Sequence, residues 1–335
     1  MDGAVEGSTL KSAVMPDLVT RISEASAAID TYAGAARAKC REHLLRDDGR
    51  PDRNELERQQ HMAHGLSWVT TYAETLRQTA EWASRLEQES KLGTIEALLT
   101  QILFSDYCAQ LVGGIPMNQG EVIRPHELDL LDEADALFAV PSIRQLVTKG
   151  KTPAVMAAAA EFLPDALGRN TVEETGLDET MSMVREQFAK YATDKIKPNA
   201  HEWHLKNEYI PMDVVNEMAE LGVFGLTIPE DFGGFGMGKI AMCVVSEELS
   251  RGYIGTGSLG TRSEIAAELI LIGGTDDQKE KWLPLIASGE ILPTAVFTEP
   301  NTGSDLGSLR TRAVKSEDGS HYSVTGNKTW ITHPV

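Results

Sequence analysis

The feature that most constrains the fold is a change of apolar period at Leu292. Upstream of it, apolar residues recur at intervals of three and four, which is the spacing of one helix face. From Leu292 to Thr298 the pattern is of the strand type, and alternation returns over 309–315 and 321–325 on either side of an Asp-Gly turn. The sequence therefore predicts a mainly α-helical chain that continues into a small β domain.

The helical spacing divides the upstream part into a bundle and a second helical domain. We expect a helical N-terminal extension over 1–165, a linker over 166–178 that follows Pro164 and carries Gly and several acids, a helical domain over 179–291, and an incomplete β domain over 292–335. The individual helices are predicted over 17–45, 56–86, 95–112, 127–149, 153–163, 179–196, 212–222, 238–251, 258–272 and 276–287. Residues 113–120 are predicted to form a loop, and Pro198 is predicted to end a helix.

Charge and cysteine usage narrow the class of protein. The 335 residues carry a formal net charge of −19, which argues against nucleic-acid binding and against docking on anionic membranes. No run of eighteen apolar residues could span a membrane, and the first ten residues do not resemble a secretion signal. The three cysteines lie far apart and are expected to be buried, reduced thiols. We therefore expect a cytoplasmic protein.

Two short patterns have a functional and an ordinary interpretation. Gly255-Thr-Gly-Ser-Leu-Gly260 matches the dinucleotide fingerprint, but the residues before it are predicted to be helical rather than a strand, so we interpret it as a loop of close backbone approach. The pairs His61/His64 and His201/His204 could each supply two metal ligands from one helix face. Neither has the carboxylate spacing of helical metal sites, so a solvent-exposed helix face is the preferred interpretation.

The segment after Leu292 carries the candidate ligand site. Thr298, Ser304 and Thr332 supply hydroxyls near strand ends, and Trp330 supplies a large aromatic ring that spacing alone would place in a strand core. Such a set suits a flat, hydrogen-bonding ligand with a phosphate tail. Glu299 could be a general base, or its carboxylate could serve turn hydrogen bonds before Pro300.

Four motifs, in order, resemble the acyl-CoA dehydrogenase family over about 178–332. They are Pro229-Glu-Asp-Phe-Gly-Gly-Phe-Gly-Met-Gly, Asp277-Gln-Lys-Glu-Lys-Trp-Leu-Pro-Leu-Ile-Ala-Ser-Gly, Thr298-Glu-Pro-Asn-Thr-Gly-Ser-Asp and Gly326-Asn-Lys-Thr-Trp-Ile-Thr. The resemblance implies an N-terminal helical domain, a middle β domain and a C-terminal four-helix domain, with FAD between them and a neighbouring subunit of a dimer or tetramer.

The resemblance also implies a role for each matching residue. Thr298 and Thr332 would hydrogen-bond the flavin ring, Trp330 would pack beside it, and Ser304 would contact the acyl-CoA and the phosphate region. The residues that line FAD would be Ala295, Phe297, Thr298, Gly303, Ser304, Trp330, Ile331 and Thr332.

The implied chemistry is α,β-dehydrogenation of an acyl-CoA thioester, with electrons passed to an electron-transfer flavoprotein. An acyl-CoA oxidase of the same fold is the alternative, and a non-catalytic binding or assembly protein is a second one. In the family, the catalytic glutamate and the C-terminal helices lie beyond the Trp-Ile-Thr motif. We therefore expect a shortened chain that lacks the base and the C-terminal helical domain and is inactive by itself.

The substrate follows from a narrower resemblance. The helical extension and Ser258-Leu-Gly-Thr-Arg-Ser are most similar to family members that convert (2S)-methylsuccinyl-CoA to mesaconyl-CoA in acetate assimilation by the ethylmalonyl-CoA pathway. Arg262 lies one helical turn after Ser258, and its forked donor group suits the free carboxylate of a dicarboxylic thioester. We expect both residues to contact substrate, with a surface salt bridge as the alternative for Arg262.

Overall fold

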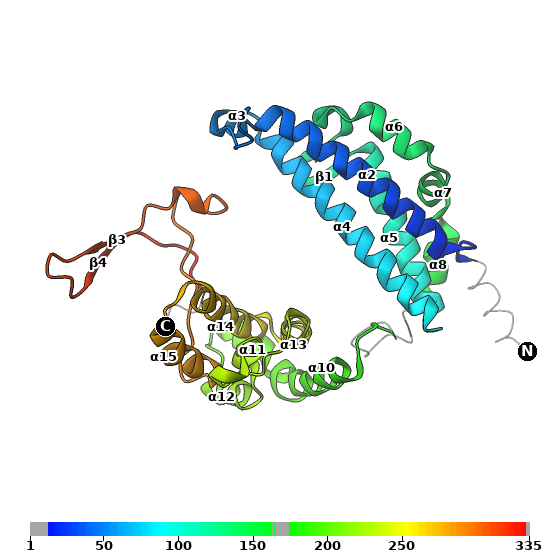
Figure 1. Cartoon of the computed structure of the whole chain (residues 1–335). Coiled ribbons are helices and arrows are strands. Elements are labelled where there is room, and N and C mark those ends of the chain that lie inside the picture. The colour runs from blue at the N-terminus through cyan, green and yellow to red at the C-terminus, as the bar shows by residue number, and fades with distance from the viewer. Residues whose placement is uncertain (1–12, 163, 165–173, 333–335) are drawn as a thin grey trace, which may run out of the picture. The chain divides into compact units, whose positions relative to one another are not determined.

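Two compact units make up the chain in a computed structural model that describes residues 13–162, 164 and 174–332. One unit comprises residues 1–176 and the other residues 177–335 (Figure 1). Each unit has its own buried apolar cluster, so the two are described separately.

The N-terminal unit is a helical bundle with a short β-hairpin. Its elements are α2 (Leu18–Leu44), α3 (Arg53–Arg58), α4 (Gln60–Gln88), α5 (Thr94–Gly113), β1 (Ile115–Asn118), β2 (Glu121–Ile123), the 3₁₀ turn η1 (Pro125–Leu128), α6 (Leu131–Ala139), α7 (Pro141–Lys149) and α8 (Pro153–Ala160). The long helices α2 and α4 lie side by side (Figure 1). Ile22, Ile29 and Leu76 from these two helices are fully buried at their contact.

Two predictions for this unit are wrong. The predicted loop over 113–120 contains strand β1 and the turn of the hairpin β1–β2, because Ile115 pairs with Ile123 of β2 and both are buried. The single helix predicted over 127–149 is divided into η1, α6 and α7. Pro141 begins α7, where its missing N–H costs nothing, and so separates it from α6.

The C-terminal unit begins with a compact group of helices. They are α10 (Glu179–Tyr191), the π segment η2 (Ala192–Ile196), α11 (Lys197–Lys206), α12 (Met212–Glu220), the 3₁₀ turns η3 (Val223–Gly225) and η4 (Glu230–Phe232), α13 (Lys239–Gly252), α14 (Ile254–Gly273) and α15 (Asp276–Ala287). Phe188, Met218 and Phe224 lie in their common core. Thr275 caps α15, because its hydroxyl accepts the Gln278 N–H at 3.3 Å.

The helix predicted to end before Pro198 continues through it. Five residues of π-helix precede the proline, and the Lys197 N–H is bonded to the Ala192 carbonyl five residues back. A π turn changes the i−4 pairing that a proline inside an α-helix would disrupt. Pro198 then occupies the first turn of α11, where its missing N–H is tolerated.

The glycine pattern at 255–260 lies inside α14, so its interpretation as a loop is wrong. The expected close approach is present: a Cβ at Gly257 would lie 1.9 Å from the Ser250 hydroxyl oxygen, and one at Gly260 would lie 2.9 Å from Val223 Cγ1. The glycines therefore let α14 pack closely on α13 and η3, and the helix tolerates them because that packing offsets their low helix propensity.

The cysteine prediction is only partly right. Cys40 and Cys108 are buried free thiols, but Cys243 is an exposed one. Cys243 lies on the exposed side of α13. The buried positions around it are Ala241, Met242, Val244 and Val245.

The last part of the unit is extended chain and one hairpin. The predicted strands at 309–315 and 321–325 are confirmed as β3 (Arg312–Lys315) and β4 (Tyr322–Thr325), which pair antiparallel from Arg312↔Thr325 to Lys315↔Tyr322. The predicted strand over 292–298 is not a strand, because these residues form no backbone ladder with any described residue.

The fold class predicted from periodicity is confirmed: the described chain is mainly α-helical with a small β content. None of the helices among the described residues has the length and apolar character needed to cross a membrane.

Candidate functional site

Two stretches that lie about thirty residues apart in the sequence run antiparallel to each other. The Thr329 N–H donates to the Thr298 carbonyl at 3.1 Å, and the Thr294 hydroxyl donates to the Thr332 carbonyl. As the residue number rises in one stretch it falls in the other. The structure thus brings together Ala295–Thr298 and Trp330–Thr332, the two groups of residues predicted to line FAD.

A single carboxylate fastens this arrangement. Glu299 accepts the N–H of Thr311 at 2.9 Å and its hydroxyl at 2.6 Å, the N–H of Arg310 at 2.9 Å, and the ammonium of Lys328 at 3.0 Å. Its backbone also exchanges two hydrogen bonds with Thr302, at 2.9 and 3.0 Å. Glu299 is 6% exposed, so these residues form a small buried polar cluster at the base of the two stretches. We call Glu299, Arg310, Thr311 and Lys328 the Glu299 cluster.

The contacts of Glu299 decide between its two interpretations. Hydrogen bonds from the Thr311 side chain, the Arg310 N–H, Lys328 and the Thr311 N–H lower the pKa of Glu299 to about 2. A general base works best with a pKa near the operating pH and with a free lone pair for the substrate proton. Glu299 has a pKa far below that range and four donors on its carboxylate, so it serves turn hydrogen bonds.

The residues predicted to contact the flavin ring have hydroxyls without hydrogen-bond partners in the described chain and exposed aromatic rings. The hydroxyls of Thr298 and Thr332 form no hydrogen bond with any described residue, although both side chains are half-buried. The rings of Phe297 and Trp330 are exposed, Trp330 by 87%. Free hydroxyls and exposed aromatic rings in the same two stretches match the donor set and the stacking surface that a flavin needs, so the residues present fit FAD.

Trp330 has a strained backbone as well as an exposed ring. Its φ of +56° lies in the left-handed region, which is rare for a bulky residue and costs about 1 kcal/mol or more. Hydrogen bonds at Thr329 and Thr332 hold the chain on either side of it. Strain of this kind is concentrated at binding sites, where the surrounding structure maintains it.

The other predicted FAD residues have looser surroundings. Ala295 and Ile331 are half-buried. Gly303 and Ser304 are exposed, and a Cβ at Gly303 would meet nothing within 4 Å. The Ser304 carbonyl accepts the Leu306 N–H at 3.1 Å, and its side chain forms no hydrogen bond with a described residue. Their assignment to FAD and acyl-CoA stays a prediction.

Two of the three predicted substrate residues share one face of α14. Ser258 and Arg262 are one helical turn apart, and both are half-buried. The Arg262 Nε atom is buried and has no hydrogen-bond partner in the described chain. Arg262 also forms no ion pair with a described residue, so the surface salt bridge is not observed. No hydrogen bond or ion pair between described residues joins α14 to 294–332.

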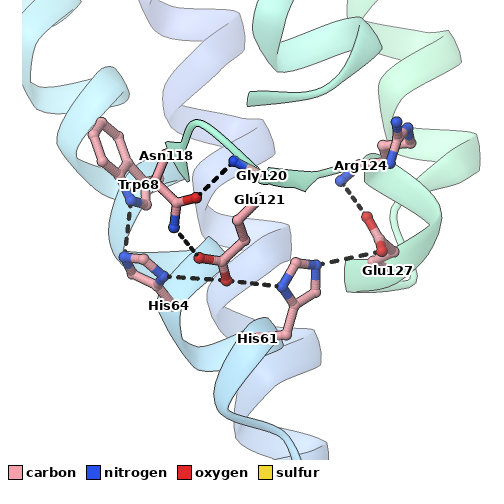
Figure 2. A network of polar contacts seen from close by, with 8 residues as sticks. All are labelled: His61, His64, Trp68, Asn118, Gly120, Glu121, Arg124 and Glu127. Carbon is pink, nitrogen blue, oxygen red and sulfur yellow. Dashed lines mark hydrogen bonds and ion pairs between the residues drawn. The ribbon is translucent and has the colours of Figure 1, made fainter. Parts of the chain in front are cut away.

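The histidine pairs have different surroundings. His201 and His204 are exposed on α11, as preferred from the sequence. His61 instead lies between two carboxylates: its Nδ1 is 3.1 Å from Glu121 and its Nε2 is 3.3 Å from Glu127 (Figure 2).

His64, the second histidine of the pair on α4, has a defined tautomer. The Trp68 indole N–H donates to His64 Nε2 at 3.0 Å, so the ring proton of His64 is on Nδ1, which lies 3.5 Å from Glu121 (Figure 2). These contacts tie the hairpin β1–β2 and η1 to α4. No cluster of three or more His, Cys, Asp and Glu residues in the described chain is arranged to hold a metal ion.

Two residues of the site were not singled out from the sequence. Lys328 lies within the motif Gly326-Asn-Lys-Thr-Trp-Ile-Thr, and its position two residues before the candidate tryptophan was the available signal. Thr311 gave no signal, because its contact with Glu299 depends on the path of the intervening loop.

Two comparisons with known proteins point to the same family. The family described as "Acyl-CoA dehydrogenase, N-terminal domain" matches residues 178–290. The (2S)-methylsuccinyl-CoA dehydrogenase of Cereibacter sphaeroides is 54% identical over 320 residues, which cover 96% of this chain and 57% of that protein.

Two mitochondrial relatives match a shorter part of the chain. The isobutyryl-CoA dehydrogenase of Dictyostelium discoideum is 38% identical over 157 residues, and the isovaleryl-CoA dehydrogenase of Bos taurus is 37% identical over 161 residues. Each alignment covers 47% of this chain and 37% of the relative. This chain therefore spans between 37% and 57% of the length of these three relatives.

The matched residues 178–290 coincide with the helices α10 to α15 and include the first two of the four motifs. The other two motifs contain Glu299 and Lys328. The resemblance read from the motifs is confirmed by these matches: residues 178–290 match the N-terminal domain of acyl-CoA dehydrogenases, and 96% of the chain aligns with a (2S)-methylsuccinyl-CoA dehydrogenase.

Proposed function

We propose that this chain provides FAD-binding and substrate-binding parts of an acyl-CoA dehydrogenase that converts (2S)-methylsuccinyl-CoA to mesaconyl-CoA. The observation that supports this substrate is the 54% identity to the Cereibacter sphaeroides enzyme over 320 residues. An alignment of that length includes both units, whereas those of 157 and 161 residues are too short to include both. The N-terminal unit is thus shared with the relative that acts on a dicarboxylic thioester.

The chain's own residues have distinct tasks in this proposal. Thr298 and Thr332 donate their free hydroxyls to the polar edge of the flavin, and Trp330 covers a face of the ring and excludes water from it. FAD, when bound, supplies the acceptor for the hydride that leaves the β-carbon of the thioester. Glu299 takes no part in removing the α-proton, because its oxygens are held by Thr311, Arg310 and Lys328.

Arg262 is the proposed partner of the free carboxylate of methylsuccinyl-CoA. Its buried Nε lacks an acceptor in the described chain, and a buried donor of a charged group is unfavourable when it has no acceptor. A substrate carboxylate would supply the missing acceptor in a forked geometry. Ser258, on the same face one turn earlier, would lie beside the acyl group.

Further parts of the proposal concern the setting of the enzyme. Electrons pass to an electron-transfer flavoprotein, the active form is a homo-oligomer, and the protein acts in the cytoplasm. The three cysteines are free thiols, which is the state expected in a reducing compartment.

The proposal is tested in two steps. Purified chain is titrated with FAD, and binding is followed by quenching of flavin fluorescence. A fusion to the part of the Cereibacter sphaeroides enzyme that this chain does not span is then mixed with methylsuccinyl-CoA or butyryl-CoA. We expect bleaching of the flavin band and formation of mesaconyl-CoA, with a preference for the dicarboxylic substrate. Failure to bind FAD, or a preference for butyryl-CoA, would contradict the proposal. Rapid reoxidation by oxygen would indicate an oxidase.

A further inference from the structure

We propose that Glu299 and Lys328 are positioning residues which hold the Ala295–Thr298 and Trp330–Thr332 stretches together and so form the flavin-binding edge. The inference rests on the proposed function for the identity of the ligand. The fastening itself rests on the contacts of the two side chains.

Glu299 connects three parts of the chain that are separated in sequence. Its own backbone closes a turn with Thr302, its carboxylate accepts from the backbone at Arg310 and Thr311, and it pairs with Lys328. The loop over 303–309 leaves this point and returns to it. A carboxylate that accepts four donors at 2.6–3.0 Å defines the geometry of all three parts at once.

Lys328 makes the link between the two flavin stretches. Its ammonium donates to the Phe297 carbonyl at 2.9 Å and to Glu299 at 3.0 Å. The side chains of Lys328 and Glu299 are only 19% and 7% exposed, so solvent screens this pair less than it would a surface pair. The next residue, Thr329, donates its N–H to Thr298.

Few other contacts between described residues hold the two stretches together. The stretches form no continuous strand ladder, and β3 and β4 pair only with each other among the described residues. Between the stretches the other links in the described chain are the Thr329 N–H and the Thr294 hydroxyl. Removing the Glu299 cluster would therefore let the stretches separate, and the hydroxyls of Thr298 and Thr332 would no longer face one ligand.

The direct test is amide hydrogen exchange of the chain without any ligand. In the Glu299→Gln variant we expect exchange at Thr311 and Thr329 to rise about tenfold or more, since charge-assisted hydrogen bonds are lost. Glu317→Gln is the matched control: it removes the same charge from an exposed side chain in the neighbouring hairpin turn. It should leave both amides within twofold of the parent.

The second test is FAD affinity of the same variants. We expect the Kd for FAD to rise about tenfold or more in Glu299→Gln and in Lys328→Met, and the double variant to bind only as weakly as the weaker single one. Lys328→Arg should restore part of the affinity and the resolved shoulder of the bound flavin's visible band, which a general loss of stability would not do.

The outcomes separate the two proposals. Parent-like exchange and parent-like FAD affinity in Glu299→Gln would overturn the positioning role, as would effects of Glu299→Gln and Lys328→Met that simply multiply. If the parent chain binds no FAD, the proposed function fails, while the exchange comparison still decides whether Glu299 fastens the stretches.

Discussion

The carboxylate of Glu248 lies 3.0 Å from the guanidinium of Arg185 and is almost completely buried, at 1% exposure. Arg251 pairs with the other carboxylate oxygen at 2.8 Å and donates to the Ala189 carbonyl. One acid therefore links α10 to α13 and satisfies two arginines inside the helical core of the C-terminal unit.

Replacing Glu248 by Ala should destabilise this unit strongly. Removing one partner of a buried pair leaves the other charges uncompensated, which costs about 3–5 kcal/mol in the free energy of unfolding. Urea denaturation followed by circular dichroism measures the change. Glu247→Ala is the control, because its side chain is 64% exposed and its contact with Arg185 is 3.7 Å long, so the expected loss is below about 1 kcal/mol. Equal losses in both variants would contradict the role of burial.

A second prediction concerns the glycine that the sequence placed in a loop. Gly257→Ala would put a methyl group 1.9 Å from the Ser250 hydroxyl oxygen and 2.8 Å from the Ser246 carbonyl, so α13 and α14 must move apart. We expect a loss of about 1–3 kcal/mol.

The control for that change is another glycine inside a helix. A methyl group at Gly34 of α2 would meet nothing within 4 Å, so Gly34→Ala should stabilise its helix by about 0.5–1 kcal/mol through reduced backbone entropy. Thermal unfolding of both variants should therefore show shifts of opposite sign. A stabilising effect of Gly257→Ala would disprove the close packing.

The third prediction is a pH dependence at the flavin segment. The pKa of Glu299 is lowered to about 2 in the folded chain, whereas an unperturbed glutamate has a value near about 4.3. A lowered pKa contributes stability that is present above the unfolded value and is lost as pH falls through the folded one. We expect the amide resonances of Arg310 and Thr311 to titrate together with a midpoint near about 2.

The variant Glu299→Gln supplies the control for this titration. With no carboxylate at position 299, the transition shared by the Arg310 and Thr311 amides should vanish. A midpoint near about 4.3 in the parent chain would show that the carboxylate is not held by these donors.

The outcome of sequence interpretation differs between local and long-range features. Helix positions follow from local spacing, so the helix predicted over 276–287 is observed as α15 (Asp276–Ala287). The glycines at 255–260 misled because packing against α13, which no local pattern reveals, offsets their poor helix propensity.

The candidate site shows the same limit. Hydroxyls and an aromatic residue in two motifs were enough to select Thr298, Trp330 and Thr332. The Glu299 cluster that joins them was not predictable. The donors to Glu299 are Arg310, Thr311 and Lys328, and whether they come close to it depends on the path of the loop between them.

The fourth prediction tests the substrate role of Arg262 in the fusion enzyme. Arg262→Met keeps most of the apolar stem but removes the guanidinium whose Nε is buried without a partner in the described chain. A lost hydrogen bond to a charged group should raise the KM for methylsuccinyl-CoA about tenfold to a hundredfold, while the KM for butyryl-CoA, which has no second carboxylate, stays unchanged. Arg262→Lys should lie between, since an ammonium keeps the charge without the fork. Arg251→Met is the contrasting variant: it breaks the contact with Glu248 and should lower stability without changing the ratio of the two KM values. If Arg262→Met left that ratio unchanged, the dicarboxylic substrate would have to be recognised by another residue.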